Sequence, residues 1–130
     1  GGAHYGLICD ASFPTFFLQR WARDAAADER IELADAIAEL TSRPAALIGM
    51  SDRGRLETGL KADINLIDLD ALKVLVPTVE YDLPAGGKRM HQRVEGIAAT
   101  IVSGKVTWRN GQPTGELPGR LVRRGAAAAA

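Results

Sequence analysis

The chain has 130 residues, of which 46% are hydrophobic and 25% are charged, as in soluble globular proteins with one modest core. Its 16 basic and 16 acidic residues balance, so no long-range field attracts nucleic acid or anionic lipid, and we expect neither nucleic acid nor a membrane as a partner. Cys9 is the only cysteine, which excludes an internal disulfide, and no apolar run reaches the ~20 residues that span a bilayer; we therefore expect a cytoplasmic protein.

The first predicted helix begins near Pro14, whose missing N–H is tolerated in a first helical turn. Phe13, Phe17 and Trp21 recur at every fourth position, which predicts one apolar face that is buried. Ordinary core packing is the favoured interpretation of this face, and an aromatic wall against a substrate is the alternative.

Two further helices are predicted before residue 50. Leu33, Ile37 and Leu40 repeat with helical spacing within residues 31–41. A short helix over residues 44–48 then begins after a cap at Ser42 or Arg43, and it ends at Gly49.

Beyond residue 50 the chain has a pattern of strands and turns, in which glycines separate short segments rich in Val, Ile and Leu. The clearest strand covers residues 62–69, and a hairpin joins residues 98–102 to 105–109 through Ser103-Gly104. A second tight turn is predicted at Asn110-Gly111. A small antiparallel sheet of this kind has two open edges, which we expect more chain or a second copy to cover.

Two stretches of sequence carry a family resemblance. In the first, residues 41–68, a Pro-Ala helix is followed by a Gly-Xaa-Leu-Xaa-Xaa-Gly turn at 54–59, then by Ala62-Asp63 and an apolar strand that ends in Asp68. In the second, the loop Leu83-Pro84-Ala85-Gly86-Gly87 precedes the final strand pair, and a Gly-Glu-Leu-Pro-Gly-Arg sequence follows at 115–120. Together they resemble the D-aminoacylase (N-acyl-D-amino-acid deacylase) group of the metal-dependent amidohydrolase superfamily.

The residues of the first stretch suit a scaffold role. Gly54 and Gly59 supply turn conformations, Leu56 is expected to pin the loop to the core, and Ala62 allows a close approach before the strand. We expect no direct catalytic part for residues 41–68.

The resemblance implies an α+β fragment: the last helices of a (β/α)8 barrel, followed by part of a small antiparallel β-sandwich domain. Residues 1–49 would be the end of the barrel and residues 50–125 the β-domain. Gly1 at the start suggests a piece of a longer protein, and the five alanines at 126–130 are interpreted as a tail or cloning remnant.

The resemblance also implies that the longer protein hydrolyses a small-molecule N-acyl amino acid. A zinc ion would lower the pKa of the attacking water, and an aspartate at the end of the eighth barrel strand would accept its proton. We expect that aspartate just before Gly1. The chain would then carry no catalytic or metal-binding residue, bind no zinc by itself, and be inactive alone.

Four residues are candidates for the lip of the substrate pocket: Gly2, His4, Asp10 and Ser12. For His4 the alternative is a loop histidine facing solvent. Asp10 has a favoured alternative role as a helix cap. His91, the other histidine, is expected to have a surface or packing role.

Two other functions stay open. The chain could be a non-catalytic, β-rich assembly or binding module that associates with itself or with a separate amino-terminal part. It could also belong to a dihydroorotase-like or hydantoinase-like amidohydrolase, because the Gly-Xaa-Leu-Xaa-Xaa-Gly and Ala-Asp motif is shared with those enzymes. The Leu83–Gly87 loop favours the D-aminoacylase group.

Overall fold

The computed structural model describes residues 10–122 and has an α+β fold, as expected. The helical segments are η1 (Asp10–Ser12), α1 (Phe13–Phe17), η2 (Leu18–Arg23), α2 (Leu33–Leu40), α3 (Ser42–Leu47) and the short turn η3 (Pro84–Gly86). The strands are β1 (Ile64–Ile67), β2 (Lys73–Val74), β3 (Thr78–Leu83), β4 (Gly87–His91), β5 (Val94–Glu95), β6 (Ile97–Val102), β7 (Lys105–Arg109) and β8 (Gln112–Pro113). Within the described range, no helix combines the length and apolar character needed to cross a bilayer.

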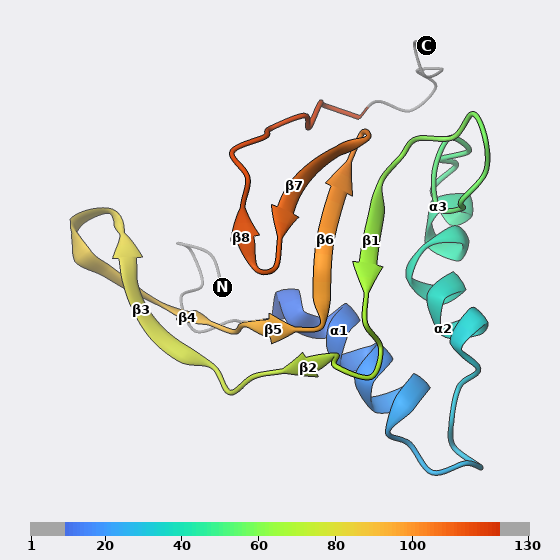
Figure 1. Cartoon of the computed structure of the whole chain (residues 1–130), viewed down its shortest axis with the longest axis horizontal. Coiled ribbons are helices and arrows are strands. Elements are labelled where there is room, and N and C mark those ends of the chain that lie inside the picture. Colours follow the sequence, from blue (N-terminus) through green and yellow to red (C-terminus); the bar gives the residue numbers. More distant parts are fainter. Residues whose placement is uncertain (1–9, 123–130) are drawn as a thin grey trace.

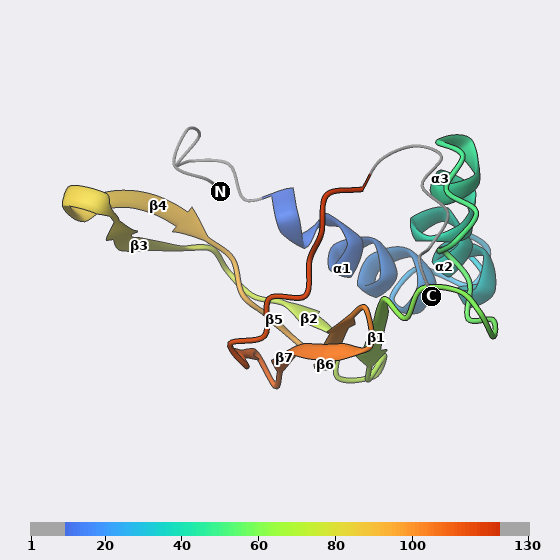
Figure 2. The same cartoon turned by 90° about the horizontal axis from the view of Figure 1, so that it is seen from above.

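The strands form three separate antiparallel groups. The largest is a four-stranded sheet in the order β1-β6-β7-β8, and β2-β5 and β3-β4 are two-stranded ribbons. The helices lie on one side of the sheet, whereas the β3-β4 ribbon projects away from both (Figures 1 and 2). Strands β1 and β8 form the two edges of the sheet, so the expected open edges are present.

Both predicted tight turns of the sheet are confirmed. Ser103 and Gly104 connect β6 to β7 with φ angles of 50° and 77°, and Asn110 and Gly111 connect β7 to β8 with φ angles of 48° and 75°. Positive φ at both central residues is the signature of hairpin turns whose twist matches that of the strands. These two dipeptides therefore set the pairing of β6 with β7 and of β7 with β8.

The first helix is present, but the expected burial of its aromatic face is wrong. Phe13 is 58% exposed and Trp21 is 37% exposed, although Phe17 packs against the core. The buried stripe consists instead of Thr15, Leu18, Ala22 and Ala25. From Leu18 to Arg23 the helix continues as a wider π-helical segment, which changes the angle between successive side chains and the core.

The second and third helices are confirmed near the predicted positions. On α2 the fully buried residue is Ala36, whereas Leu33 and Ile37 remain 43% and 38% exposed. Helix α3 follows after a single residue, Thr41, which occupies the capping position expected for Ser42 or Arg43. Gly49 ends this region with φ of 74°.

The core is small and is shared by the helical and stranded halves. Leu18 and Ala22 of η2 pack with Ala36 of α2 and with Leu72, which precedes β2 and is 1% exposed. Partly buried side chains surround this group: Phe17, Ile31, Leu40, Leu69 and Ile97. The two halves of the described chain therefore do not have separate cores.

Many large apolar side chains lie at the surface of the described chain. Leu47, Leu56 and Val76 are each at least 80% exposed, and Leu117 is 93% exposed. The expectation that Leu56 pins its loop to the core is wrong for this reason. Exposed apolar surface of this extent is typical of regions that contact further protein.

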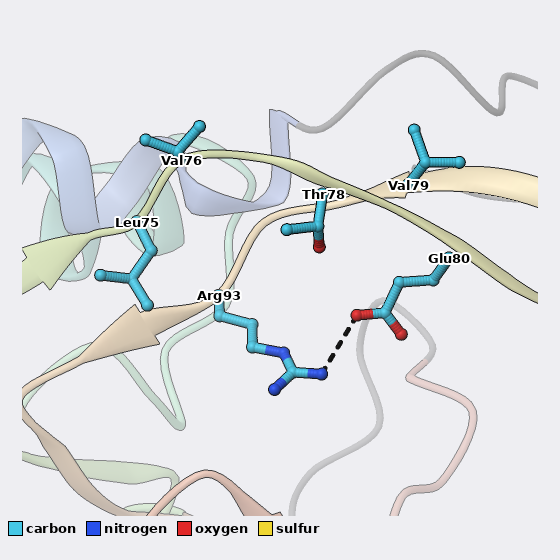
Figure 3. Close-up of a pocket in the computed structure, with 6 residues that line it drawn as sticks. All are labelled: Leu75, Val76, Thr78, Val79, Glu80 and Arg93. Carbon is cyan, nitrogen blue, oxygen red and sulfur yellow. Dashed lines mark hydrogen bonds and ion pairs between the residues drawn. The ribbon is translucent and has the colours of Figure 1, made fainter.

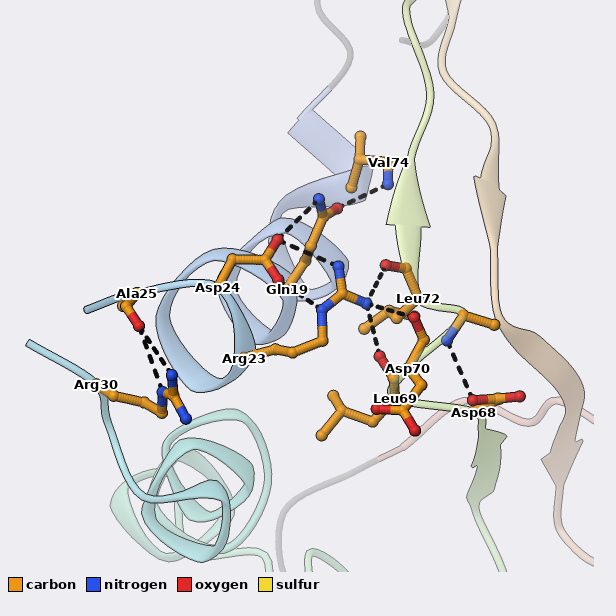
Figure 4. Close-up of polar contacts among 11 residues, drawn as sticks. Gln19, Arg23, Asp24, Ala25, Arg30, Asp68, Leu69, Asp70, Leu72 and Val74 are labelled. Atoms are coloured by element: carbon orange, nitrogen blue, oxygen red, sulfur yellow. Dashed lines mark hydrogen bonds and ion pairs between the residues drawn. The ribbon is translucent and has the colours of Figure 1, made fainter. Parts of the chain in front are cut away.

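One arginine joins η2 to the loop between β1 and β2. The guanidinium of Arg23 donates to the carbonyl oxygens of Leu69, Asp70 and Leu72 at 2.7, 3.0 and 2.7 Å (Figure 4). Its other nitrogens bind Asp24 at 2.6 and 3.2 Å, and this hydrogen bonding lowers the pKa of the Asp24 carboxyl. The Arg23 side chain thus supplies a donor to the carbonyls of Asp70 and Leu72, and a second donor to the carbonyl of Leu69, which also accepts the N–H of Leu72 at 3.3 Å.

Gly96, which lies between β5 and β6, packs closely against this loop, and its replacement tests that packing. A Cβ atom on Gly96 would lie 2.6 Å from both N and Cα of Leu72, and φ is +84°. Gly96→Ala is therefore expected to lower the free energy of unfolding by about 2–4 kcal/mol, from steric overlap and backbone strain together. Urea denaturation followed by tryptophan fluorescence measures the loss. Gly59→Ala is the matched control, since φ is +89° there but no atom lies within 4 Å; equal losses in both variants would contradict the packing argument.

Replacement of Arg23 tests the link between the halves. Arg23→Ala is expected to lower the urea midpoint clearly, because three loop carbonyls each lose a hydrogen bond from the guanidinium. Arg23→Lys should recover only part of the loss, since an ammonium cannot reproduce the planar guanidinium. Arg55→Ala serves as the control, because Arg55 is exposed and pairs only locally with Glu57. A midpoint for Arg23→Ala equal to that of the control would disprove the role assigned to Arg23.

Candidate functional site

The start of the first helix is linked to the base of the β3-β4 ribbon. Ser12 Oγ donates to Oε1 of Gln92, and Nε2 of Gln92 donates to the carbonyl oxygen of Leu75 at 2.9 Å. Gln92 follows β4, and Leu75 follows β2. One of the four pocket candidates, Ser12, is therefore held next to the ribbon.

Asp10 lies at the exposed start of η1, two residues before Ser12. The N-cap position of α1 belongs to Ser12, and no side-chain hydrogen bond caps this end of the helix. The favoured capping role of Asp10 is therefore not seen at α1. Its other expected role, at the lip of a pocket, stays a prediction.

The other two candidates, Gly2 and His4, lie outside the residues that the structure describes. Their expected positions in a substrate pocket therefore also stay predictions.

An open groove of about 390 Å³ lies beside the Ser12–Gln92 link. It is lined by Leu75, Val76, Thr78, Val79, Glu80 and Arg93. The side chains of Arg93 and Glu80 meet in the groove at 3.1 Å, and the other lining groups are apolar apart from the Thr78 hydroxyl (Figure 3). The groove can therefore receive an apolar group next to an ion pair.

Glu80 is ionised in this groove. Its Oε1 lies 3.1 Å from Nδ1 of His91 and 3.1 Å from a guanidinium nitrogen of Arg93. Hydrogen bonding to His91, and then to Arg93, holds the pKa of the Glu80 carboxyl below its ordinary value. His91 thus packs against a carboxylate, in agreement with the surface or packing role expected for it.

Sequence reasoning missed this groove, because its residues come from two strands and the segments that flank them. A signal was nevertheless present. Acidic residues alternate on β3, at Glu80 and Asp82, and basic ones alternate at Arg89, His91 and Arg93 on the return strand and just beyond it. Alternation of opposite charges on two neighbouring segments is typical of a ribbon with one charged face.

The residues described do not fit a zinc centre. Among residues 10–122, no three His, Cys, Asp or Glu side chains lie close enough together to hold a metal ion. A catalytic zinc site normally takes three protein ligands.

The Ala62-Asp63 motif is a structural device. The Asp63 carboxylate accepts the backbone N–H of Ser103 at 2.8 Å and binds Nζ of Lys61 at 2.5 Å, and the Ala62 carbonyl accepts the N–H of Gly104 at 2.9 Å. Burial raises the pKa of the Asp63 carboxyl, but the hydrogen bonds from Lys61 and Ser103 outweigh it, so the net shift is downward. The motif fastens β1 to the β6-β7 turn, which agrees with the scaffold role expected for it.

Comparison with known proteins gives a family. The model of the amidohydrolase family matches residues 3–108. Over 115 residues the chain is 32% identical to the N-acyl-D-glutamate deacylase of Alcaligenes xylosoxydans xylosoxydans, a match that covers 88% of this chain and 21% of that protein. The chain thus spans about a fifth of the length of this relative. No solved structure matches the chain significantly.

The family match covers most of the chain. It includes both stretches on which the resemblance to D-aminoacylases rests, apart from the closing residues 115–120. The chain therefore belongs to the amidohydrolase family, as a segment similar to D-aminoacylases.

Proposed function

We propose that this chain is the carboxy-terminal part of a metal-dependent N-acyl-D-amino-acid deacylase. The observation that carries this proposal is the match to an N-acyl-D-glutamate deacylase across 88% of the chain. The substrate would be a small N-acyl amino acid, and the bond cleaved would be its amide. The metal would be zinc, held by residues outside the described chain.

Within this proposal, residues 1–49 are the end of the catalytic barrel and residues 50–125 belong to a small β-domain. The order of elements supports the division, since among residues 10–122 the longer helices end by Leu47 and the strands begin at or after Ile64. The barrel and the sandwich would each be completed by polypeptide that precedes this chain. The exposed apolar side chains of the described residues supply surface for such packing.

The proposed pocket lip contains Gly2, His4, Asp10 and Ser12. In a (β/α)8 barrel the active site lies where strands pass into helices. Asp10 and Ser12 stand directly before α1, at such a position if α1 is the last barrel helix. The catalytic aspartate and the metal ligands would precede them, so the isolated chain would have no deacylase activity.

The longer protein that contains this segment should be tested for deacylase activity. Loaded with zinc, it is expected to release acetate and D-glutamate from N-acetyl-D-glutamate, with much slower release from the L-enantiomer because the pocket is chiral. A coupled assay for free acetate measures the rate with both enantiomers. The 130-residue chain alone, assayed in parallel with zinc present, is expected to give no turnover.

Two outcomes would reject the proposal. Hydrolysis of dihydroorotate or a hydantoin by the longer protein, with none of N-acyl-D-amino acids, would assign it to another branch of the family. Turnover by the isolated chain would show that the catalytic residues lie within it.

A further inference from the structure

The β3-β4 ribbon, residues 78–91, forms an arm that stands apart from the rest of the described chain. Its strands pack chiefly on each other and on the turn η3 at the tip. Both views show the arm leaving the body at β2 and β5 and extending away from the sheet and the helices (Figures 1 and 2). A two-stranded ribbon without support is marginally stable in water, so this arm needs a surface to rest on.

The two faces of the arm differ in chemistry. Because side chains alternate along a strand, Val79 and Tyr81 share one face of β3, and Met90 is the cross-strand partner of Val79. Val79 is 52% exposed and Tyr81 is 70% exposed. Lys88 is exposed and lies two residues before Met90 on β4, so it belongs to the same face, near the tip of the arm. The apolar part of this face has no partner among the described residues beyond the arm itself and the groove at its base.

The opposite face satisfies its own charges. Arg89 donates to Asp82 at 2.7 and 2.5 Å, and Glu80 binds His91 and Arg93 at 3.1 Å each. The hydrogen bonds from Arg89 also lower the pKa of the Asp82 carboxyl. Since these acids and bases are paired within the arm, the charged face does not require a ligand, and the apolar face is the one left to be covered.

The size of the apolar face argues against a separate partner. Six residues of β3 extend for about 20 Å, and two strands about 5 Å apart give a face of roughly 200 Å². A stable complex between separate proteins buries about 800 Å² on each partner. A contact within one polypeptide needs much less, because the connecting chain keeps the effective concentration high.

The direction of the arm indicates which part of the polypeptide it meets. Its base is tied to Ser12 through Gln92, and from there it extends past the start of α1, opposite to the direction in which that helix runs (Figures 1 and 2). If α1 is a barrel helix, its start lies at the catalytic end of the barrel. The arm therefore points beyond that end.

We propose that the arm packs the Val79, Tyr81 and Met90 face against the catalytic barrel of the same polypeptide, at the rim of the substrate entrance. This inference rests on the proposed function for the existence of the barrel. The arm forms one wall of the entrance, and its apolar face contacts the loops that lead from barrel strands to barrel helices. Tyr81, as the largest exposed side chain of that face, is its main contact.

Photo-crosslinking in the longer protein tests the position of the arm without using substrate. Tyr81 is replaced by p-benzoylphenylalanine, and the crosslinked peptides are identified by mass spectrometry. Crosslinks within one polypeptide, to loops at the catalytic end of the barrel, are expected. The same replacement at Leu117, which is 93% exposed and lies outside the arm, is the control and should not reach those loops.

Kinetics test the role at the entrance. Tyr81→Ser is expected to raise KM for N-acetyl-D-glutamate about tenfold, the size of effect typical for one buried aromatic contact, with little change in kcat. Leu117→Ser should leave both constants unchanged. Thermal unfolding of the two variants shows whether either loses its fold.

The outcomes separate this inference from the proposed function. Crosslinks from Tyr81 only to a second copy, or to no barrel loop, would overturn the position of the arm even in an active deacylase. An unchanged KM despite barrel crosslinks would overturn the role at the entrance. Lack of deacylase activity with crosslinks to the barrel rim would reject the proposed reaction and leave the position of the arm supported.

Discussion

The carbonyl groups of the loop between β1 and β2 set the main constraint on this structure, and Arg23 meets it. This loop carries Leu72, which is 1% exposed, into contact with η2 and α2. Backbone carbonyls at such a position require donors, and the Arg23 guanidinium provides three hydrogen bonds to them. Close approach of Gly96 to the same loop completes the junction. Helices and strands are thus joined by polar contacts around a minimal apolar centre.

The composition of that centre explains why so much apolar surface remains outside. Two alanines, Ala22 and Ala36, make up half of that centre, beside Leu18 and Leu72. Five of the seven buried hydrophobic residues in the described range are alanines, so the close contacts bring backbones together but bury little area. Larger side chains such as Phe13, Leu47 and Leu56 remain mostly exposed. Since burial scales with apolar area, a fold of this kind draws modest stability from its own core. This agrees with a segment that spans about a fifth of a related enzyme.

Local signals in the sequence were sufficient for the turns and for the existence of the helices. Ser103-Gly104 predicts its hairpin because few other dipeptides accept positive φ at both positions. The buried face of the first helix could not be predicted in the same way, because the helix has two apolar faces, and periodicity does not say which of Phe13 or Leu18 points inward. The contact between Ser12 and Gln92 joins residues 80 positions apart, and no local pattern reports such a contact. The roles of the four candidate site residues were inferred from the family pattern. Two of them lie in the described range, and the structure places one, Ser12, in a side-chain hydrogen bond with Gln92.

The contact between Ser12 and Gln92 connects the two regions with the clearest functional meaning. Ser12 stands where the chain enters its first helix, and Gln92 stands where the arm returns to the body. A shift of the arm at its base would therefore act on the start of α1 through this hydrogen bond, and on η2 through the bond from the N–H of Val74 to Gln19 Oε1. On the charged face of the arm, Asp82 pairs with Arg89 and Glu80 pairs with its two bases. The charge that the arm brings to an apolar surface is therefore the ammonium of the exposed Lys88, near the tip. A lysine can keep its ammonium in water while its methylene groups cover apolar surface. The arm can therefore make this contact with little desolvation of its own charge, which allows a small apolar face to be enough.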